Sequence, residues 1–480
     1  MKKFKKAMAL SLAAAMGLSL VACGKDDDKK DDKTEAATEA ATEAATEAAT
    51  EGETEAATEA ATEAATEATA DGDAAALVAA ITDTSTKINV YSWNTELGDR
   101  LKYFKDKYPE YADLVVYQNL GLGGTSDDYK TAIQSAIDAG GDNYPSIIAC
   151  DNDVALYFLQ DKDNIVPVSE IGITDAMYSE AFDYTVEYAT VDGQLMGLTW
   201  QAAPGCFVYR NDIADDVLGA HDEATVQEAV KDWDAFLATA DKMKEKNYKM
   251  LSGPDDVKYV YLDQRTSPWV ADDKLNIDSA VTDYLEMAKK LYDGDYTNKT
   301  AMWNDDWNAN FSGNVFGYFG CTWFVYWCIP NDSKFYGNCS MVQGPKSYHW
   351  GGTYLGVTKD CPNKPLAALV LYTLCCDKDA MAKLSEETLD FVNNKAAMKS
   401  LIDAGKGASE VLGGQNPLSI WYEAAQGISL KNATEYDSTI NGFLDTASQA
   451  YNSGEVKSVD DAVANIKSDV QNAYSFITVE

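Results

Sequence analysis

The sequence predicts an α/β protein with more than one domain, and three observations support this prediction. From Lys87 onward, short apolar runs of strand length alternate with amphipathic stretches of helical length. Such alternation is typical of parallel strands joined by helices. The chain has 480 residues, which is enough for two or three domains. Aromatic residues make up 11% of the chain although the first 85 residues contain only Phe4, so the rest of the chain is richer in aromatic rings than this figure suggests.

Residues 1–22 have the three parts of an export signal. Four lysines precede an uncharged run, residues 7–20, which is too short to span a bilayer because that takes about 20 residues. The junction Leu20-Val21-Ala22-Cys23-Gly24 resembles the lipobox of bacterial lipoproteins. This resemblance implies that Cys23 is lipidated and that lipid alone attaches the protein to the extracellular face of the cell membrane. An ordinary signal peptide with a chance cysteine is the alternative.

Residues 23–86 are predicted to form a disordered acidic spacer that starts at the lipidated cysteine. Most of this segment repeats Thr-Glu-Ala-Ala, which places glutamates at i and i+4, where like charges repel. The repeat also lacks an apolar stripe that could pack against another element. As a flexible coil of about 60 residues, it would have an end-to-end distance of roughly 45 Å. We expect it to hold the folded part away from the membrane.

The first strands and helices after the spacer follow one another regularly. Strands are predicted at 87–91, 114–117 and 146–150, where short apolar runs stand between turn residues. Apolar residues at helical spacing predict helices through 97–108 and 129–139. Because strands and helices alternate, we expect a parallel sheet, with a ligand at the carboxyl ends of its strands.

A second unit is predicted to begin near Leu198. Its predicted strands lie at 206–210, 315–319 and 354–357, and its predicted helices at 226–243, 278–291 and 366–376. The last helix should start at Ser458, whose hydroxyl can cap it while Asp461 reaches back. This helix would bury Val459, Val463, Ile466 and Val470, and we interpret it as a packing element.

Charge and composition exclude several classes of function. The formal net charge is −38, of which the part from Lys87 onward keeps −28, and this argues against nucleic acid and anionic lipid as partners. His221 and His349 are the only histidines, which disfavours a histidine-rich metal site. Eight cysteines remain besides Cys23, and we predict mostly unpaired thiols because several end apolar runs and none forms a CxxC pair. Disulfides among them are the alternative.

A series of motifs resembles, in its order, the extracellular solute-binding lipoproteins of bacterial ABC importers, in the sugar-binding group (family 1). These motifs are KINVYSW, YPSII, DGQLMGLTW leading into CFVYRNDI, FGYFGCTWF, HWGGTYLGV, FVNNKAAM and VLGGQNP. The resemblance implies a two-lobe α/β fold of the type II periplasmic-binding-protein kind, with a ligand cleft between the lobes. Lobe 1 would comprise residues 87–203 and 352–413, and lobe 2 would comprise residues 204–351 and 414–480. The family further implies a monomer that captures a carbohydrate, expected here to be an oligosaccharide, and delivers it to the transmembrane subunits of an ABC permease.

A sugar site needs flat rings for its apolar faces and polar groups for its hydroxyls. We predict ligand contacts from tryptophans at strand ends or in loops: Trp93, Trp200, Trp323, Trp350 and Trp421. The predicted polar contacts are Asn94, Asp151, Asp153, Gln201, Gln415 and Asn416. The tryptophans could instead pack in cores, and Asn94, Asp151 and Asp153 could instead cap helices. Trp303 and Trp307 stay undecided, Trp233 is assigned to a core, and Arg265 is assigned to a surface ion pair.

Two other functions stay open. Acidic loops beside tryptophan also suit a cationic amine or peptide, and a surface glycoside hydrolase could hide its two carboxyl groups among 77 acidic residues. Gly121-Leu122-Gly123-Gly124 lacks the full dinucleotide fingerprint, and the stretch from Asp293 lacks the glycine and glutamate of a calcium loop. We therefore expect no catalytic residues, no metal and no cofactor.

Overall fold

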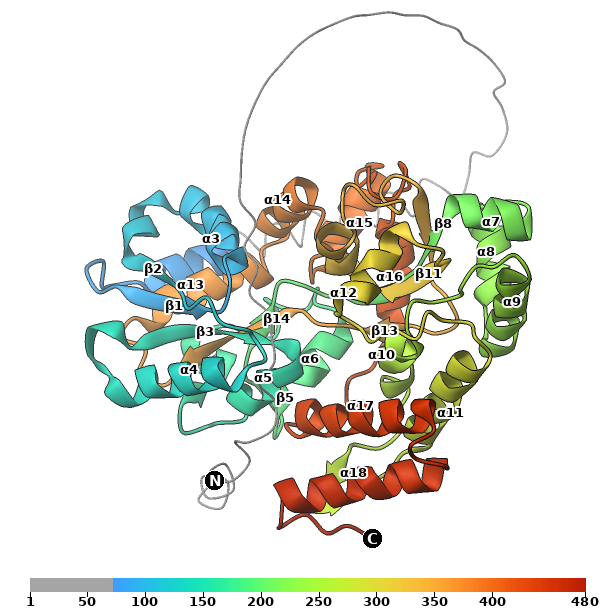
Figure 1. Cartoon of the computed structure of the whole chain (residues 1–480). Coiled ribbons are helices and arrows are strands. Elements are labelled where there is room, and N and C mark those ends of the chain that lie inside the picture. The colour runs from blue at the N-terminus through green and yellow to red at the C-terminus, as the bar shows by residue number, and fades with distance from the viewer. Residues whose placement is uncertain (1–71) are drawn as a thin grey trace, which may run out of the picture. The chain divides into compact units, whose positions relative to one another are not determined.

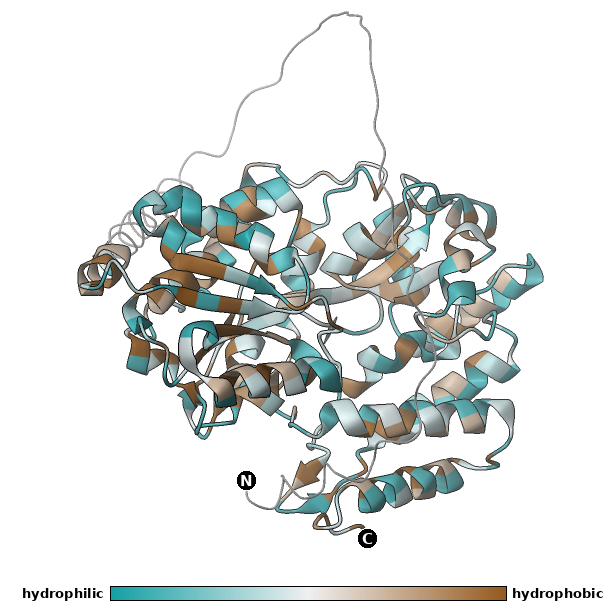
Figure 2. Cartoon of the chain, turned by 60° about the vertical axis from the view of Figure 1, so that its left-hand side comes forward, coloured by the Kyte–Doolittle hydropathy of each residue, from teal (hydrophilic) through white to brown (hydrophobic). Residues whose placement is uncertain are grey.

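The computed structural model describes residues 72–480, which contain two larger β-sheets with helices packed around them (Figure 1). The signal, Cys23 and most of the acidic spacer lie outside the described residues. In Figure 2 brown, apolar stretches occur in the strands of the sheets, whereas brown and teal segments alternate along the helices. This distribution follows from burial, because helices cover the sheets and remove apolar strand residues from water.

The first sheet has the strand order β2-β1-β3-β14-β4, and β7 also pairs with β14. Its strands are β1 (Ile88–Ser92), β2 (Val115–Asn119), β3 (Pro145–Asp151), β4 (Ile165–Val166), β7 (Leu198–Thr199) and β14 (Thr353–Thr358). As predicted, β1 runs parallel to β2 and to β3. By contrast, β14, which the chain reaches after crossing back from the other sheet, is antiparallel to β3.

Helices on both sides cover this first sheet. Figure 1 shows α3 above it and α4 below it. The helices of this region are α3 (Glu96–Lys107), α4 (Asp127–Ala139), α5 (Asn152–Leu159), α6 (Asp183–Ala189), α13 (Lys364–Cys375), α14 (Lys378–Thr388) and α15 (Lys395–Asp403). Ten residues of α13, from Leu366 to Cys375, are buried, which explains its uniformly apolar sequence.

The second sheet is antiparallel and has the order β11-β8-β12, with β13 also paired to β8. Its strands are β8 (Pro204–Arg210), β11 (Gly317–Gly320), β12 (Cys339–Val342) and β13 (Tyr348–His349). The helices of this half are α7 (Asn211–Leu218), α8 (Glu223–Val230), α9 (Trp233–Glu245), α10 (Lys258–Leu262), α11 (Ser279–Asp293), α12 (Asp305–Ala309), α16 (Leu418–Gln426), α17 (Asp437–Ser453) and α18 (Val459–Ala473). Every residue of β8 is buried, which fits its place in the middle of the sheet.

Two connections join the sheets directly. Residues 200–203 lead from β7 of the first sheet to β8 of the second, and residues 350–352 lead from β13 back to β14. The chain passes from the first half to the second again between α15 and α16. Because β7 and β14 pair with each other, the two direct connections leave the first sheet side by side.

The folded part begins earlier than predicted. Residues 72–80 form a helix, and Leu77 and Ile81 are only 3% and 8% exposed. The Asn363 side chain also donates a hydrogen bond of 3.0 Å to the carbonyl oxygen of Asp83. The prediction of a disordered spacer is therefore wrong for residues 72–86. Leu77 and Ile81 supply the apolar groups that the Thr-Glu-Ala-Ala repeat lacks.

The predicted cap of the last helix and the predicted free thiols are confirmed. Ser458 caps α18 by accepting a hydrogen bond from the backbone of Asp461. The helix buries Ile466 and Val470 as predicted, but Val459 and Val463 are only partly buried. All eight cysteines of the described part carry free thiols, and seven of them are buried. Within residues 72–480, no helix combines the length and the apolar character that crossing a membrane requires.

Candidate functional site

A cavity of about 290 Å³ lies between elements from both halves of the fold, and we call it the central cavity. The first half contributes Asn152 and Asp153 at the start of α5 and Tyr188 in α6. The second half contributes α10, the loop of Trp303 and the α17 helix. A ligand in this cavity would therefore touch both halves of the protein.

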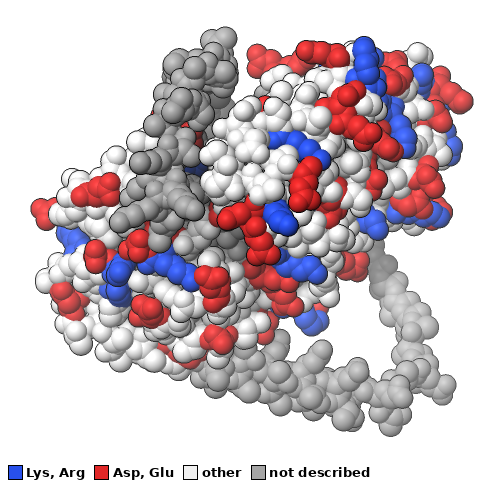
Figure 3. Space-filling model, turned by 90° about the horizontal axis from the view of Figure 1, so that it is seen from below, with Lys and Arg blue, Asp and Glu red and all other residues white. Residues whose placement is uncertain are grey.

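Aspartates outnumber basic residues around the central cavity. Its lining includes Asp153, Asp263, Asp437 and Asp445, against Lys258 and Arg265. Lys258 forms an ion pair of 2.9 Å with Asp445, and Arg265 forms an ion pair with Asp437. Asp153 and Asp263 have no such partner, and burial raises the pKa of both, that of Asp263 to about 7. The cavity is thus acidic, as is the protein, whose acidic side chains are numerous in Figure 3.

Two buried polar atoms beside the central cavity make no hydrogen bond in the structure. One is the Nη1 atom of Arg265, whose side chain is 8% exposed, and the other is the Oδ1 atom of Asn152, a residue that is 9% exposed. The first is a donor and the second an acceptor. Leaving such groups unpaired costs free energy, and a hydroxyl can pair with either because it both donates and accepts.

Trp303 presents a large apolar surface in the wall of the central cavity. Its side chain is 50% exposed, although it stacks on Trp323 with ring centroids 6.0 Å apart and contacts Trp350 at 5.5 Å. Its backbone φ is 73°, in the left-handed region that bulky residues rarely adopt. Strain of this kind is most often found at functional sites. Trp303 therefore combines an exposed indole with an unusual backbone in the cavity wall, which makes it a candidate ligand contact.

Three of the sequence-predicted residues lie in or next to the central cavity. Asp153 lines it directly. Trp323 and Trp350 contact Trp303, and the indole nitrogen of Trp323 donates a hydrogen bond of 3.0 Å to the carbonyl oxygen of Trp350. Trp350 is buried and stacks on Tyr259, which also lines the cavity. Trp323 and Trp350 thus support the walls of the cavity.

Asp151 caps α5 in this structure, which is the alternative considered for it from sequence. Its Oδ1 atom accepts a hydrogen bond of 3.0 Å from the backbone of Asp153. Burial and, to a smaller extent, the nearby carboxylate of Asp153 together raise the pKa of Asp151 to about 7. The two carboxyl groups repel each other when both are ionised, and protonation of one of them removes this repulsion.

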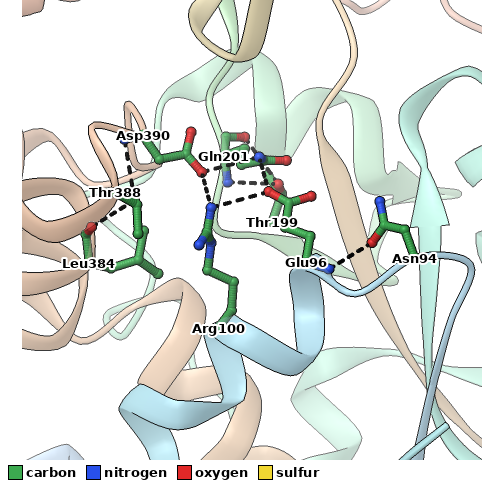
Figure 4. Close-up of polar contacts among 8 residues, drawn as sticks. All are labelled: Asn94, Glu96, Arg100, Thr199, Gln201, Leu384, Thr388 and Asp390. Carbon is green, nitrogen blue, oxygen red and sulfur yellow. Dashed lines mark hydrogen bonds and ion pairs between the residues drawn. The ribbon is translucent and has the colours of Figure 1, made fainter. Parts of the chain in front are cut away.

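Gln201 and Asn94 belong to a buried polar network in the first half (Figure 4). The Nε2 atom of Gln201 donates hydrogen bonds to Glu96 at 2.8 Å and to Asp390 at 3.1 Å. Arg100 lies 3.3 Å and 3.5 Å from the same two carboxylates. Asn94 accepts a hydrogen bond of 3.0 Å from the backbone of Glu96. Because two acids share one arginine, burial and Asp390 raise the pKa of Glu96 to about 7.

The remaining tryptophans pack within the protein. Trp200 and Trp421 have no exposed surface. The sequence predicted Trp421 at a strand end or in a loop, but it lies inside α16. Trp93 is half-buried and packs edge-on against Tyr129, at 5.7 Å between ring centroids. None of the three lines the central cavity.

Gln415 and Asn416 fix the chain between α15 and α16. Gln415 accepts a hydrogen bond of 2.8 Å from the backbone nitrogen of Met341 and donates one of 2.9 Å to its carbonyl oxygen, so it extends the edge of β12. The side chain of Asn416 bonds to the backbone of Lys406 and of Leu418. Both amides are therefore saturated within the protein.

Several cavity residues were not predicted, or were assigned another role, from sequence. Arg265 does form the expected ion pair, but the pair is buried in the cavity wall and not on the surface. Tyr188, Lys258 and α17 were missed altogether. The α17 helix carries polar residues at helical spacing along the cavity, Ser438, Asn441 and Asp445, and this polar stripe was the available signal.

Metal coordination has no evident centre in residues 72–480. No group of three or more histidine, cysteine, aspartate or glutamate side chains in this region could hold a metal ion. What the cavity offers instead is an exposed indole, free hydrogen-bonding atoms and carboxylates, which are the means of binding a polar organic solute.

Comparison with known proteins agrees with this geometry. Residues 122–404 match the family of bacterial extracellular solute-binding proteins. No curated protein matches the chain by sequence. The structure is similar to that of a solved extracellular solute-binding protein of family 1, with a TM-score of 0.69 and 17% identity, covering 82% of this chain and 100% of that one.

Two further solved structures have a similar fold. One is an ABC-transporter-associated binding protein of B. animalis subsp. lactis in complex with β-1,6-galactobiose, with a TM-score of 0.63, 18% identity and coverage of 82% of this chain and 99% of that one. The other is the galacto-N-biose/lacto-N-biose I-binding protein of Bifidobacterium longum in complex with lacto-N-biose, with a TM-score of 0.64, 14% identity and the same coverage.

The fold and the family match together define the class of this protein. Two lobes, each built on its own sheet and joined by direct connections, form the fold of the solute-binding proteins. Because the family match covers more than half of the chain, the chain belongs to the bacterial extracellular solute-binding proteins.

Proposed function

We propose that this protein captures a carbohydrate in the central cavity and delivers it to the transmembrane subunits of an ABC permease. The observation that carries the proposal is Trp303, whose half-exposed indole lines the same cavity as Asn152 and Arg265, each of which has a buried polar atom without a hydrogen bond. The apolar face of a sugar ring would stack on it, while sugar hydroxyls would bond to Asn152 and Arg265. The sugar-bound neighbours of similar fold support this choice of ligand.

Binding would draw the two halves together. Asn152, Asp153 and Tyr188 come from the first half, and Trp303 and α17 come from the second. A ligand that touches both sides favours the arrangement in which both can reach it, and this difference in affinity is what closure requires. The protein would act as a monomer and without catalysis, since its task is to hold the solute and release it unchanged.

The N-terminal segment would attach the protein to the cell. Cys23 in Leu20-Val21-Ala22-Cys23-Gly24 would carry lipid after removal of residues 1–22, and the acidic repeat would tether the folded part on the extracellular face. Replacing Cys23 by serine should shift the protein from the membrane fraction to the soluble exported fraction. Retention of the Cys23→Ser variant in the membrane would contradict the lipid anchor.

A thermal-shift screen against a glycan panel tests the proposed ligand class. The panel should include galactose, β-1,6-galactobiose, lacto-N-biose, maltose and maltotetraose. A ligand at 100 times its Kd stabilises the folded state by about 2.7 kcal/mol, which raises the melting temperature measurably. Product analysis of the same mixtures should find every glycan intact. The absence of any shift, or the hydrolysis of a glycan, would contradict the proposal.

The excess of aspartates around the cavity favours a second candidate, a cationic amine or peptide. Salt distinguishes the two. Binding of a polycation such as spermidine should weaken strongly between 50 mM and 500 mM NaCl, because screening reduces attraction between charges. Binding of a neutral glycan should change little over the same range. A spermidine shift larger than every glycan shift would favour the cationic ligand.

A further inference from the structure

The carboxylates of the central cavity outnumber the positive charges that can balance them. Four aspartates line the cavity, and both basic residues of the lining form ion pairs with aspartates of α17. This leaves Asp153 and Asp263 without an ion-pair partner among residues 72–480. His349 also lines the cavity, but burial lowers the pKa of its imidazole to about 3, so the ring is neutral. With all four aspartates ionised, the lining therefore carries two uncompensated negative charges.

The two unpaired aspartates are costly to ionise where they lie. Burial is the main reason, and it raises the pKa of Asp153 and raises that of Asp263 to about 7. The polar and charged groups around the two carboxyl groups come from several elements, and they are Asp151, Asn152, Lys258, Arg265, His349, Asp437 and Asp445. The carboxylates in this set oppose a further negative charge, and the others favour it. A neutral ligand would displace water without supplying charge, and would make ionisation still less favourable.

A ligand with an ammonium group has the opposite effect on these aspartates. A positive charge favours the ionised form of a nearby carboxylate, and each N–H of an ammonium group needs an acceptor. The cavity supplies acceptors in Asp153, in Asp263 and in Asn152, whose buried Oδ1 atom makes no hydrogen bond. Hydrogen bonds between charged groups are roughly twice as strong as those between neutral ones. The polar part of the lining therefore favours a cationic group.

The aromatic part of the lining favours a ring. The side chain of Trp303 is 50% exposed, and Tyr259 stacks on Trp350 with ring centroids 4.9 Å apart. Flat aromatic faces bind the apolar face of a sugar ring, and they also attract a cation. A volume of about 290 Å³ suits a small ligand that touches the aromatic wall and the aspartates together. An open-chain polyamine has no ring to stack on Trp303.

We propose that the ligand of the central cavity is an amino sugar, with its ring on Trp303 and its ammonium group held by Asp153 and Asp263. This inference rests on the proposed function, because it names the chemical class of the same carbohydrate. It assigns Asp153 as the residue that selects a charged sugar over a neutral one. It differs from the cationic alternative, because the ligand needs both a sugar ring and a charge.

Calorimetric titration of the wild type with matched sugars tests the inference. One series is glucose, glucosamine and N-acetylglucosamine, and the other is galactose, galactosamine and N-acetylgalactosamine. Each series compares a hydroxyl, an ammonium group and a neutral amide at the same ring position, at pH 7, where most of the free amine is charged. In at least one series the amino sugar should bind about ten-fold more tightly than both neutral members, because a charge-assisted hydrogen bond replaces a neutral one.

Replacing Asp153 by asparagine should remove this selectivity. The change keeps the shape of the side chain and removes its charge, so the ratio of the neutral-sugar Kd to the amino-sugar Kd should fall from about ten to about one. Asp163→Asn is the matched control, because Asp163 is exposed in the same half of the protein and does not line the cavity. It should leave the ratio at about ten. An equal loss of the ratio in both variants would overturn the role of Asp153.

The protons exchanged on binding give a second readout that needs no variant. Titration at pH 6.5 in two buffers of different ionisation enthalpy counts them. An ammonium group beside Asp153 and Asp263 favours their ionised forms, so an amino sugar should release protons. A neutral sugar should release none, and should take protons up where it displaces water from the carboxyl groups. Proton uptake on binding of the amino sugar, or no exchange, would overturn the inference.

The outcomes separate this inference from the proposed function. Failure of every sugar to bind, in both series and in the wider glycan panel, would overturn both. A neutral sugar that binds at least as tightly as its amino counterpart in both series would overturn this inference alone. Spermidine that binds more tightly than every sugar would overturn both and would favour the cationic ligand without a ring.

Discussion

Replacing Trp303 by alanine tests whether this side chain binds ligand or merely packs. Half of the side chain is covered by its neighbours and half is exposed in the wall of the central cavity. The substitution should therefore have two separable effects, one on ligand affinity and one on the stability of the ligand-free protein. Trp327, which is 67% exposed and does not line the central cavity, provides a matched control.

The exposed fraction sets the magnitude of both effects. A fully covered tryptophan side chain buries about 200 Å², so the exposed half offers roughly 100 Å² to a ligand. At about 25 cal/mol per Å², this area contributes up to about 2.5 kcal/mol, and its loss weakens the Kd by roughly 50- to 100-fold. The covered half, packed on Trp323 and Trp350, contributes a similar amount to the free energy of unfolding.

Calorimetric titration with the tightest glycan of the panel measures the affinity, and urea unfolding measures the stability. Trp303→Ala should lose 50- to 100-fold in affinity, whereas Trp327→Ala should lose none. Trp303→Gly should be about 1 kcal/mol more stable than Trp303→Ala, because glycine adopts a φ of 73° without strain. Equal affinities for the two alanine variants would refute the assignment of Trp303 as a stacking surface. An alanine variant more stable than the glycine variant would refute the strain.

Three further predictions follow from burial. Burial raises the pKa of Asp263 to about 7 from its ordinary value of 3.8, so its contribution to stability is present at low pH and is lost as the pH rises through about 7. Between pH 4 and pH 7 the unfolding free energy of the wild type should fall as the pH rises, and in Asp263→Asn this fall should be less steep by up to about 1.4 kcal/mol per pH unit. Urea unfolding at several pH values measures the slope. An equal slope in both proteins would contradict the raised pKa of Asp263. His349, whose pKa burial lowers to about 3, gives an opposite slope in both proteins and cancels in the comparison. Trp421→Ala should lower the unfolding free energy by about 3–5 kcal/mol without changing glycan affinity, and lost affinity at unchanged stability would show that it contacts ligand. A chain starting at residue 87 should be about 3–6 kcal/mol less stable than one starting at residue 72, because it lacks Leu77 and Ile81, and equal stability would place the helix at 72–80 outside the cooperative core.

The strands could be predicted from sequence because buried strands appear as continuous apolar runs. The cores of β1, β3 and β8 coincide with such runs. The antiparallel place of β14 could not be predicted, because it depends on how the chain returns from the second sheet and not on the strand itself. Periodicity alone predicted an α/β fold with more than one domain, whereas the order of the motifs, through its resemblance to a known family, predicted the two lobes.

The site was harder to predict than the fold. The α17 helix lacks a side-chain cap at Tyr436, and although Ile440, Leu444 and Ala447 form its buried apolar stripe, this stripe indicates packing and does not reveal that the polar face lines a cavity. Trp200 and Trp421 were predicted to contact ligand on the same grounds as Trp323, because all three lie at predicted strand ends or in predicted loops. Tertiary packing nevertheless buries Trp200 and Trp421 completely. From sequence, Trp303 could not be distinguished from Trp307. In the structure Trp303 is half-exposed, whereas Trp307 lies in α12, is buried and donates its indole N–H to Asp256.

A crystal structure of the protein with the tightest glycan of the panel tests the central claim most directly. The account predicts one sugar ring stacked on Trp303 in the central cavity, within hydrogen-bond distance of Asn152 and Arg265. A glycan bound elsewhere, with the face of Trp303 left uncovered, would contradict it.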